Sequence, residues 1–332
     1  MGVLQTFDEL RDELQSTLRT GGTDTEVGKC GMALNKALRQ MHISPGHKFP
    51  WAERRAILIT HAPYVTGTVS LTTATSRLIL TGTDTLWATA VTGFGFNNVR
   101  AGGKLVLGGT QEVYTVDTVT SDTSLTLQSR YTGDDLSGNT YRYFEDEYSL
   151  TADFLRFVDV ANFSADSKIP LLGRTEFRNL WTRNDITGKP KLATQVQLGF
   201  VSTTLPQHRI VLHPAPDNEY SIPYWYVTSN LALSAAGAEQ AAMVELTDEP
   251  IIPLIYREAL ILYAQSVYYR DYRDDLERSQ LAYGQFTDMM MRFSNEHTSD
   301  KPKFIMGCGT TEMRRQKFDT GGRFDSLRDR WR

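Results

Sequence analysis

One short pattern in this sequence could bind phosphate. The segment from Gly22 to Cys30 holds two glycines followed by Lys29. Backbone amides of such a loop can cradle phosphate groups, while a following Ser or Thr holds magnesium. Here the glycines are one residue too far apart, Cys30 replaces the Ser or Thr, and a helix rather than a strand is predicted before the loop. We therefore expect a turn that begins a helix, and no nucleotide.

Histidines and carboxylates near residue 210 could bind a metal. His208 and His213 flank a predicted strand, and they could share a metal only if Asp217 or Glu219 folded back toward them. Their odd spacing places them on opposite faces of an extended strand, because side chains alternate. Separate roles are therefore expected, and the sequence predicts no metal and no cofactor.

Adjacent carboxylates could serve hydrolysis. The candidates are Asp134 with Asp135, and Asp146 with Glu147. Neighbours in sequence usually point apart, whereas glycoside hydrolysis needs two carboxylates facing one another across roughly 5 to 10 Å. No GxSxG or HExxH pattern is present either. The sequence therefore predicts that the protein is not an enzyme, with a cell-wall hydrolase as the remaining alternative.

Composition narrows the class of protein. The 332 residues, with 40% hydrophobic and 22% charged side chains, can form two or three domains. A net charge of -4 argues against a dedicated nucleic-acid binder. Cys30 and Cys308 cannot build a disulfide framework, so a reducing compartment is expected. No apolar run is long enough to span a membrane, and we expect synthesis in the cytoplasm.

A capping box predicts where the first helix begins. In the segment Thr6-Phe7-Asp8-Glu9, the Thr6 hydroxyl and the Glu9 carboxylate can accept hydrogen bonds from each other's backbone amides. Apolar residues then recur at helical spacing on two successive segments, which are separated by a Gly-Gly turn. The two apolar faces comprise Phe7, Leu10, Leu14 and Leu18, and then Val27, Cys30, Leu34, Leu38 and Met41. These patterns predict a helical hairpin.

The middle of the chain has the pattern of β-strands. Between Tyr64 and Tyr143 it is rich in Thr and Gly, and β-branched residues recur with period two, which predicts a small inserted barrel or sandwich. Further strands are expected at Trp51 to His61, Glu147 to Val160, Ala193 to Val201, Arg209 to His213 and Ile222 to Thr228, with a short helix at Arg174 to Trp181. Strand edges and turns are expected at Pro206, Pro214, Pro216 and Pro223.

Two helices are predicted near the C-terminus. Asp248-Glu249-Pro250 signals the start of the first, and Asp274 and Asp275 cap the second. The second carries a stripe with steps of three and four: Tyr272, Leu276, Ser279, Tyr283, Phe286, Met290 and Phe293. We expect this stripe to pack on the preceding helix, with a coiled coil to a partner as the alternative.

Past Phe304 the periodicity ends. Basic residues and isolated aromatics alternate from Met313 to Arg332, and such a segment cannot bury enough of itself to fold alone. We expect it to become ordered on a partner, with a merely solvated tail as the alternative. The candidate interface residues are Arg314, Arg315, Lys317, Phe318, Arg323, Phe324, Arg328, Arg330, Trp331 and Arg332.

Several segments together resemble a known family. The order GTVS, Thr81-Gly82-Thr83 with Trp87, AGGKLVL, YTVDTVTSDTSLTL and YTG is similar to an inserted module of phage neck and tail proteins. The N-terminal hairpin and the closing segment EALILYAQSVYYRDYRDDLERSQLAYGQFTDMMMRF resemble the head-to-tail connector (adaptor) proteins of tailed bacteriophages, of the tail tubular protein A type. The resemblance covers most of the chain and rests on arrangement rather than on an invariant motif.

This resemblance implies a structural protein of the virion's head-to-tail junction. Its expected partners are the portal protein, a downstream tail or nozzle protein, further copies of itself in a ring of about 12, and passing double-stranded DNA without sequence preference. The expected fold is α+β: a helical bundle from both ends, a central β region, the inserted module and an extended arm. The corresponding ranges are 1–63 with 144–304, then 64–143, then 305–332.

A second hypothesis makes the inserted module a binding site for a host receptor or carbohydrate. Its platform would be Trp87, Phe94 and Phe96, because sugars stack on exposed aromatics. A module this small needs its aromatics inside, so we expect Trp87 to fill the core instead.

Overall fold

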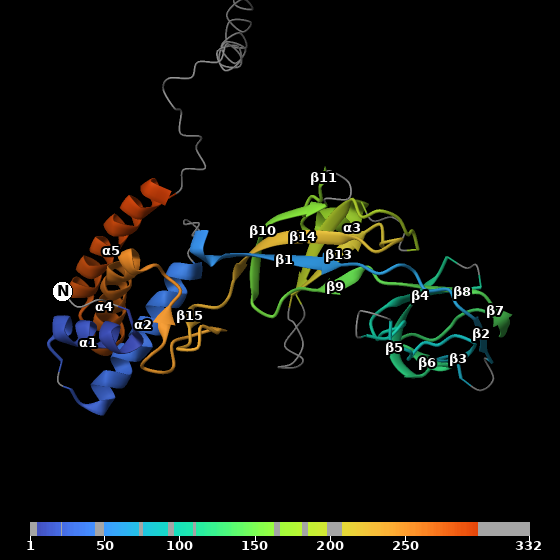
Figure 1. Ribbon diagram of the computed structural model, residues 1–332, viewed down its shortest axis with the longest axis horizontal. Helices are drawn as coiled ribbons and strands as arrows, with labels where there is room; N and C mark the ends of the chain where they lie inside the picture. Colours follow the sequence, from blue (N-terminus) through green and yellow to red (C-terminus); the bar gives the residue numbers. More distant parts are fainter. Residues whose placement is uncertain are drawn as a thin grey trace, which may run out of the picture. The chain divides into compact units, whose positions relative to one another are not determined.

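The computed structural model describes residues 5–20, 22–43, 50–72, 76–91, 96–108, 111–162, 167–180, 185–197 and 208–297. The chain divides into two compact units (Figure 1). The helical unit combines Met1–Phe49 with Ile252–Arg332, and the β-rich unit comprises Pro50–Ile251. The described residues form five α-helices and several antiparallel sheets, which confirms the α+β class. The finer division at residues 64 and 143 stays a prediction.

Helix α1 (Phe7–Leu18) begins at the predicted capping box. The backbone N–H of Glu9 donates to the Thr6 hydroxyl at 3.4 Å, and the N–H of Thr6 donates to the Glu9 carboxylate at 3.0 Å. These bonds and the amide of Gln5 lower the pKa of Glu9. All four predicted face residues are buried: Phe7, Leu10, Leu14 and Leu18. The helix ends one residue before the predicted Thr-Gly-Gly stop, because Arg19 itself adopts the left-handed conformation (φ 48°).

Helix α2 (Asp24–Ile43) runs through the supposed phosphate loop. Gly28 and Lys29 lie inside this helix, so the residues cannot form a phosphate cradle. Its predicted face is confirmed at Cys30, Leu34, Leu38 and Met41, which are buried, whereas Val27 is only partly covered. This face packs on α4 (Arg257–Tyr272).

The start of α4 corrects the prediction. Asp248 does not cap a helix: its carboxylate accepts from the backbone N–H groups of Val244 and Glu245 at 2.6 and 2.7 Å. Glu249–Pro250 forms the short strand β17, and a 3-10 turn (η3, Leu254–Tyr256) precedes α4. The Asp248 carboxylate therefore stabilises the loop that precedes it rather than the N-terminus of a helix that follows it.

Helix α5 (Leu276–His297) packs along α4, as expected of a hairpin. Its predicted cap is confirmed at Asp275, whose carboxylate accepts from the N–H of Arg278 at 3.1 Å, whereas Asp274 forms the turn before the helix with φ 51°. The predicted stripe is correct only in part. Ser279 and Met290 are buried, but Leu276 and Tyr283 are more than half exposed. Tyr283 and Phe286 still contact Tyr263 of α4, so the stripe faces α4 but lies at the edge of the contact and stays partly in solvent.

The β-rich unit contains a four-stranded sheet in the order β1-β14-β10-β11. Its strands are β1 (Glu53–Ile59), β10 (Phe154–Asn162), β11 (Ser167–Lys168) and β14 (Ser221–Thr228). A short 3-10 turn, η1 (Pro50–Ala52), leads into β1. Pro223 lies in a central strand rather than at an edge, which corrects the prediction. It sits just past the last residue of β14 that pairs with β10, so no bond on that side needs its missing N–H.

A second sheet has the order β12-β13-β9, and a third has the order β16-β15-β17. Their strands are β9 (Glu147–Ser149), β12 (Leu192–Gln197), β13 (His208–His213), β15 (Ala232–Leu233) and β16 (Glu239–Gln240), with β17 as above. The predicted strand from Glu147 to Val160 is thus two strands, β9 and β10, in two different sheets. The predicted short helix is α3 (Arg174–Leu180). One apolar core, which includes Phe154, Ile210 and Tyr224, joins the first two sheets.

The Thr- and Gly-rich segment forms a seven-stranded antiparallel sheet that curls into a half-barrel (Figure 1). The strand order is β7-β2-β3-β6-β5-β4-β8. The strands are β2 (Thr68–Leu71), β3 (Ile79–Thr83), β4 (Lys104–Leu107), β5 (Val113–Ser121), β6 (Ser124–Leu127), β7 (Leu136–Asn139) and β8 (Tyr141–Phe144). The two outermost strands, β7 and β8, are separated only by Thr140, so the chain itself draws the ends of the sheet together.

Trp87 fills the centre of this half-barrel, as predicted. It is fully buried, and its indole N–H donates to the Tyr141 hydroxyl at 2.9 Å. The Tyr141 hydroxyl then donates to the backbone carbonyl of Thr66 at 2.6 Å. A buried indole N–H needs a hydrogen-bond acceptor. The hydroxyl of Tyr141, which is itself buried, is that acceptor.

Candidate functional site

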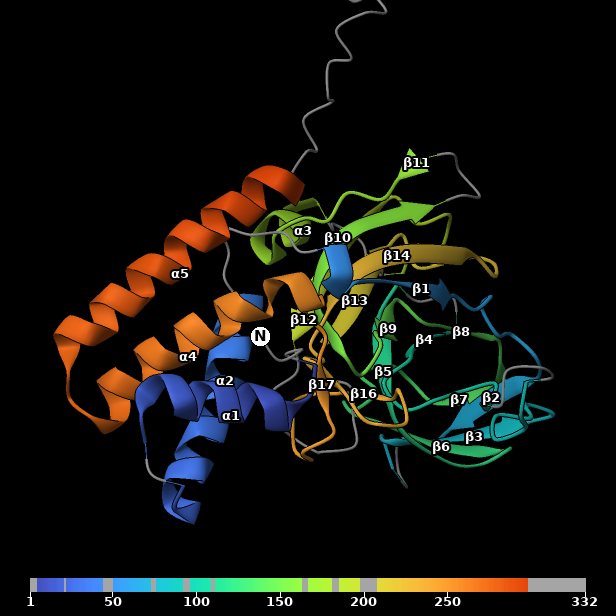
Figure 2. The same ribbon diagram turned by 60° about the vertical axis from the view of Figure 1, so that its left-hand side comes forward.

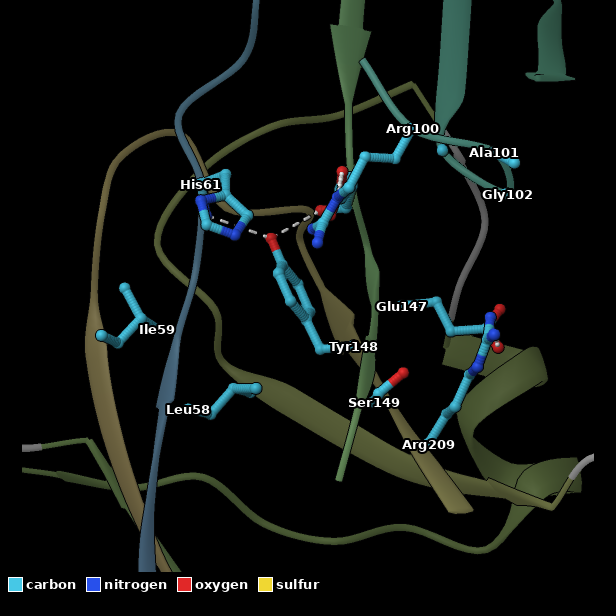
Figure 3. Close-up of a pocket in the computed structure, with 12 residues that line it drawn as sticks. Leu58, Ile59, His61, Arg100, Ala101, Gly102, Glu147, Tyr148, Ser149 and Arg209 are labelled. Carbon is cyan, nitrogen blue, oxygen red and sulfur yellow. Dashed lines mark hydrogen bonds and ion pairs between the residues drawn. The ribbon is translucent and has the colours of Figure 1, made fainter. Parts of the chain in front are cut away.

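A cavity of about 280 Å³ lies where the half-barrel meets the strands that precede and follow it (Figure 3). The half-barrel contributes the turn Arg100–Gly103 just before β4. The other wall comes from the end of β1, from β9 and from Arg209 of β13. The cavity is therefore built by segments that lie far apart in the sequence.

Arg100 and Glu145 form the central contact of the cavity. The Arg100 Nε donates to Glu145 Oε1 at 2.9 Å, and its Nη2 donates to Oε2, so the pair is bidentate. The Glu145 side chain is 9% exposed and that of Arg100 is 36% exposed. Bidentate geometry fixes direction as well as distance. Arg100 belongs to the turn before β4 of the half-barrel, and Glu145 to the link between β8 and β9. The pair therefore connects the half-barrel to the segment that leads into β9.

Two tyrosines extend this contact. The Tyr143 hydroxyl donates to Glu145 Oε1 at 2.6 Å, and the Tyr148 hydroxyl donates to the Glu145 backbone carbonyl at 3.1 Å. The backbone N–H of His61 donates to the Tyr148 hydroxyl at 3.3 Å, which brings in the strand that enters the module. Burial, followed by the nearby Glu145 carboxylate, raises the pKa of both tyrosines. Both hydroxyls are therefore donors at neutral pH.

Aromatic contacts close one side of the network. The Phe96 ring lies 4.4 Å from the His61 ring and 4.2 Å from the Arg100 guanidinium. Burial lowers the pKa of His61, so its imidazole is neutral at pH 7. Gly103 lies against the Tyr143 ring, and a Cβ at this position would come within 2.2 Å of the tyrosine hydroxyl. Only glycine fits there without displacing the ring.

Two further ion pairs flank the cavity. Arg209 lies 3.3 Å from Glu147, and Lys104 lies 3.3 Å from the nearly buried Asp146. Burial raises the pKa of Asp146, although Lys104 acts in the opposite direction. In Figure 3, Glu147 and Arg209 lie together on one side of the cavity, away from His61. These pairs again join separate elements, because Lys104 is on β4 and Arg209 is on β13.

Arg100, Glu145, Tyr143 and Tyr148 bind one another across separate segments, and we call this network the joint. Ser149 lines the cavity, but among the described residues no base accepts a hydrogen bond from its hydroxyl. A nucleophile needs such a base to be activated. Over the described ranges, no group of three or more His, Cys, Asp or Glu side chains is placed to hold a metal ion. What the described residues show here is a hydrogen-bonded connection between segments.

The other predicted candidates are not brought together. His208 lies beside Phe154 while His213 lies beside Phe177 of α3, in agreement with the expected separate roles. Asp134 and Asp135 are exposed, and the adjacent Asp146 and Glu147 are each tied to a cation.

Trp87, the largest ring of the hypothetical receptor-binding platform, is buried and cannot stack on a ligand at the surface. Phe96 is engaged with His61 and Arg100, and Phe94 lies outside the described residues. The ten candidate interface residues between Arg314 and Arg332 also lie outside the described residues, as does Cys308.

No known protein family matches this chain, and no curated protein matches it. Within the part of the chain that the structure describes, no helix is long and apolar enough to cross a membrane.

The residues of the joint were not predicted from the sequence. Arg100, Tyr143 and Glu145 belong to no motif, and the pair that matters most is separated by 45 positions. One signal was present: Arg100 directly precedes the Gly-rich turn Ala101-Gly102-Gly103, where a backbone can approach another chain segment closely.

Proposed function

We propose that this protein is the adaptor of a tailed bacteriophage, a ring-forming structural protein that joins the portal to the tail and continues the DNA channel. It is made in the host cytoplasm and resides at the head-to-tail junction of the virion. Its partners are the portal protein, the downstream tail or nozzle protein, about eleven further copies of itself and the passing DNA.

One observation supports this proposal most directly. Helices from the two ends of the chain belong to one compact unit, and the strands between them belong to another. This is the segment order that the resemblance to connector proteins implies. The proposal adds that the terminal helices form the bundle of the ring and that residues 305–332 form an arm which binds the portal.

The joint at Arg100 and Glu145 suits a mechanical role. A module inserted into a ring protein can add contacts between neighbours or to the next ring only if its orientation is fixed. Bidentate and charge-assisted bonds fix orientation better than apolar contacts, which are not directional. The joint would therefore hold the half-barrel at a constant angle to strands β9 and β13 in every copy.

The decisive experiment is a cryo-electron microscopy reconstruction of the virion or assembly from which the chain comes. A ring of this chain directly below the portal, with density for residues 305–332 against the portal, is the expected result. Density at a distal tail tip would support receptor binding instead. Absence of the chain from purified particles would refute a structural role in the virion.

A further inference from the structure

Two helices of the helical unit carry an exposed stripe on the side opposite to their buried face. On α2 the stripe consists of Met32, Arg39 and Ile43, and its two apolar side chains are 56% and 53% exposed. On α5 it consists of Leu281, Asp288 and Met291, and the apolar ones are 66% and 57% exposed. We call these the α2 stripe and the α5 stripe. Exposed apolar side chains scattered singly are ordinary on a protein surface, so the case for a contact surface depends on how the two stripes match each other.

The two stripes lie on different sides of the helical unit. Helix α4 packs against both α2 and α5, and it lies between them in Figure 2. The buried residues of α2, such as Leu34 and Leu38, and those of α5, such as Ala282 and Met290, face this interior. Both stripes therefore point away from α4, and a single copy cannot bring them together.

The stripes match in spacing. Arg39 follows Met32 by seven residues, and Asp288 follows Leu281 by seven residues. Seven residues span about 10.5 Å along a helix and return to nearly the same face. The second apolar residue follows after four positions on α2 and after three on α5. When α2 and α5 of two copies lie parallel, the apolar residues face each other at both ends of the stripes. Arg39 then lies opposite Asp288.

The charges at the centre of the stripes are complementary. Arg39 and Asp288 are both exposed, and neither has a hydrogen-bond or ion-pair partner among the residues that the structure describes. Lys36 borders Arg39 but is already paired with Asp271 of its own chain. Figures 1 and 2 show α2 and α5 running in the same general direction, as a parallel contact between similarly oriented copies requires.

We propose that the occupant of each stripe is a second copy of this chain: the α2 stripe of one copy binds the α5 stripe of the next, with Arg39 paired to Asp288. Such a contact is heterologous, so an open row of copies keeps a free α2 stripe at one end and a free α5 stripe at the other, and these two join when the rotation between neighbours closes a ring. This inference rests on the proposed adaptor function, to which it adds the faces and the register of the contact between neighbours.

The test is a charge exchange in the full-length protein. Sedimentation velocity over a wide concentration range measures association for the wild type, for Arg39→Asp, for Asp288→Arg and for the double variant. Each single variant places like charges opposite each other and is expected to weaken association at least about tenfold. The double variant restores opposite charges and is expected to recover most of the loss. High salt should weaken wild-type association.

A matched control separates this contact from a general effect of charge. Asp12→Arg reverses an exposed carboxylate on α1, outside both stripes, and should leave association unchanged. Circular dichroism melts confirm that every variant is folded. A wild type that stays monomeric at all concentrations, or a double variant no better than the single ones, overturns the proposed contact. A ring seen below the portal but built from other faces would overturn it while leaving the adaptor function intact.

Discussion

The Glu145 carboxylate accepts hydrogen bonds from Arg100 and Tyr143 at the joint of the β-rich unit. Replacing it by Gln removes the charge and leaves the guanidinium without its counter-ion. Loss of one partner from a buried pair costs several kcal/mol, and the partial exposure of Arg100 reduces the expected loss to about 1–3 kcal/mol. Chemical denaturation would measure this loss as a lower free energy of unfolding.

The matched control for Glu145→Gln is Glu147→Gln. Glu147 also pairs with an arginine in the same cavity, but at 3.3 Å and with 27% of its side chain exposed. Its loss is expected to stay below about 1 kcal/mol, as for other partly solvated pairs. Equal losses in the two variants would show that the bidentate Arg100–Glu145 pair stabilises the fold no more than the Arg209–Glu147 pair does.

At the scale of elements, α2 contains two glycines whose surroundings differ. A Cβ at Gly28 would meet nothing within 4 Å, whereas one at Gly31 would lie 3.1 Å from the Phe7 ring. Alanine is favoured over glycine in a helix interior, so Gly28→Ala should raise the free energy of unfolding by up to about 1 kcal/mol. Gly31→Ala should gain less or lose stability, because the ring must move. Thermal melts that rank Gly31→Ala above Gly28→Ala would contradict this packing.

The stabilisation that Asp248 provides in the loop before β17 is expected to depend on pH. Burial raises the pKa of Asp248, but the backbone N–H groups of Val244 and Glu245 outweigh it, and the net pKa is lowered. A carboxyl whose pKa is lower in the folded state stabilises the fold above its unfolded pKa of about 3.9, and this stabilisation is lost as the pH falls through the folded value. Asp248→Asn should therefore melt below the wild type at pH 7.

The melting difference for Asp248→Asn should shrink as the pH drops below about 4, where the wild-type carboxyl also becomes neutral. Melting curves of both proteins at pH 7, 5, 4 and 3 provide the measurement. A difference that stays constant across this range would mean that the lost contacts do not depend on the charge of Asp248.

At the scale of the whole molecule, the proposed arm can be tested by deletion. Deleting Met313 to Arg332 removes seven basic residues and the aromatic anchors between them. The truncated chain is expected to melt at the wild-type temperature but to lose binding to the portal, since avidity from many arms disappears together. Co-sedimentation with portal rings measures this binding. Full binding by the truncated chain would remove the arm from the proposal.

The sequence by itself determined the features that depend on neighbours along the chain. The capping box at Thr6 and Glu9, the buried face of α1 and the α+β class all follow from local spacing. A helix cap needs partners only three residues away, and a strand shows its period within a few residues. These features could be predicted because their physical causes are short-ranged.

The tertiary structure alone decided the features whose partners are distant in sequence. Arg100 meets Glu145 only because β4 pairs with β8 and brings the two turns together. Asp248 looks like a helix cap locally, but the fold uses its carboxylate for the loop behind it. The α2 and α5 stripes become visible only when α4 covers the opposite faces of both helices. In each case the free energy comes from burial and pairing across the fold, which no local pattern encodes.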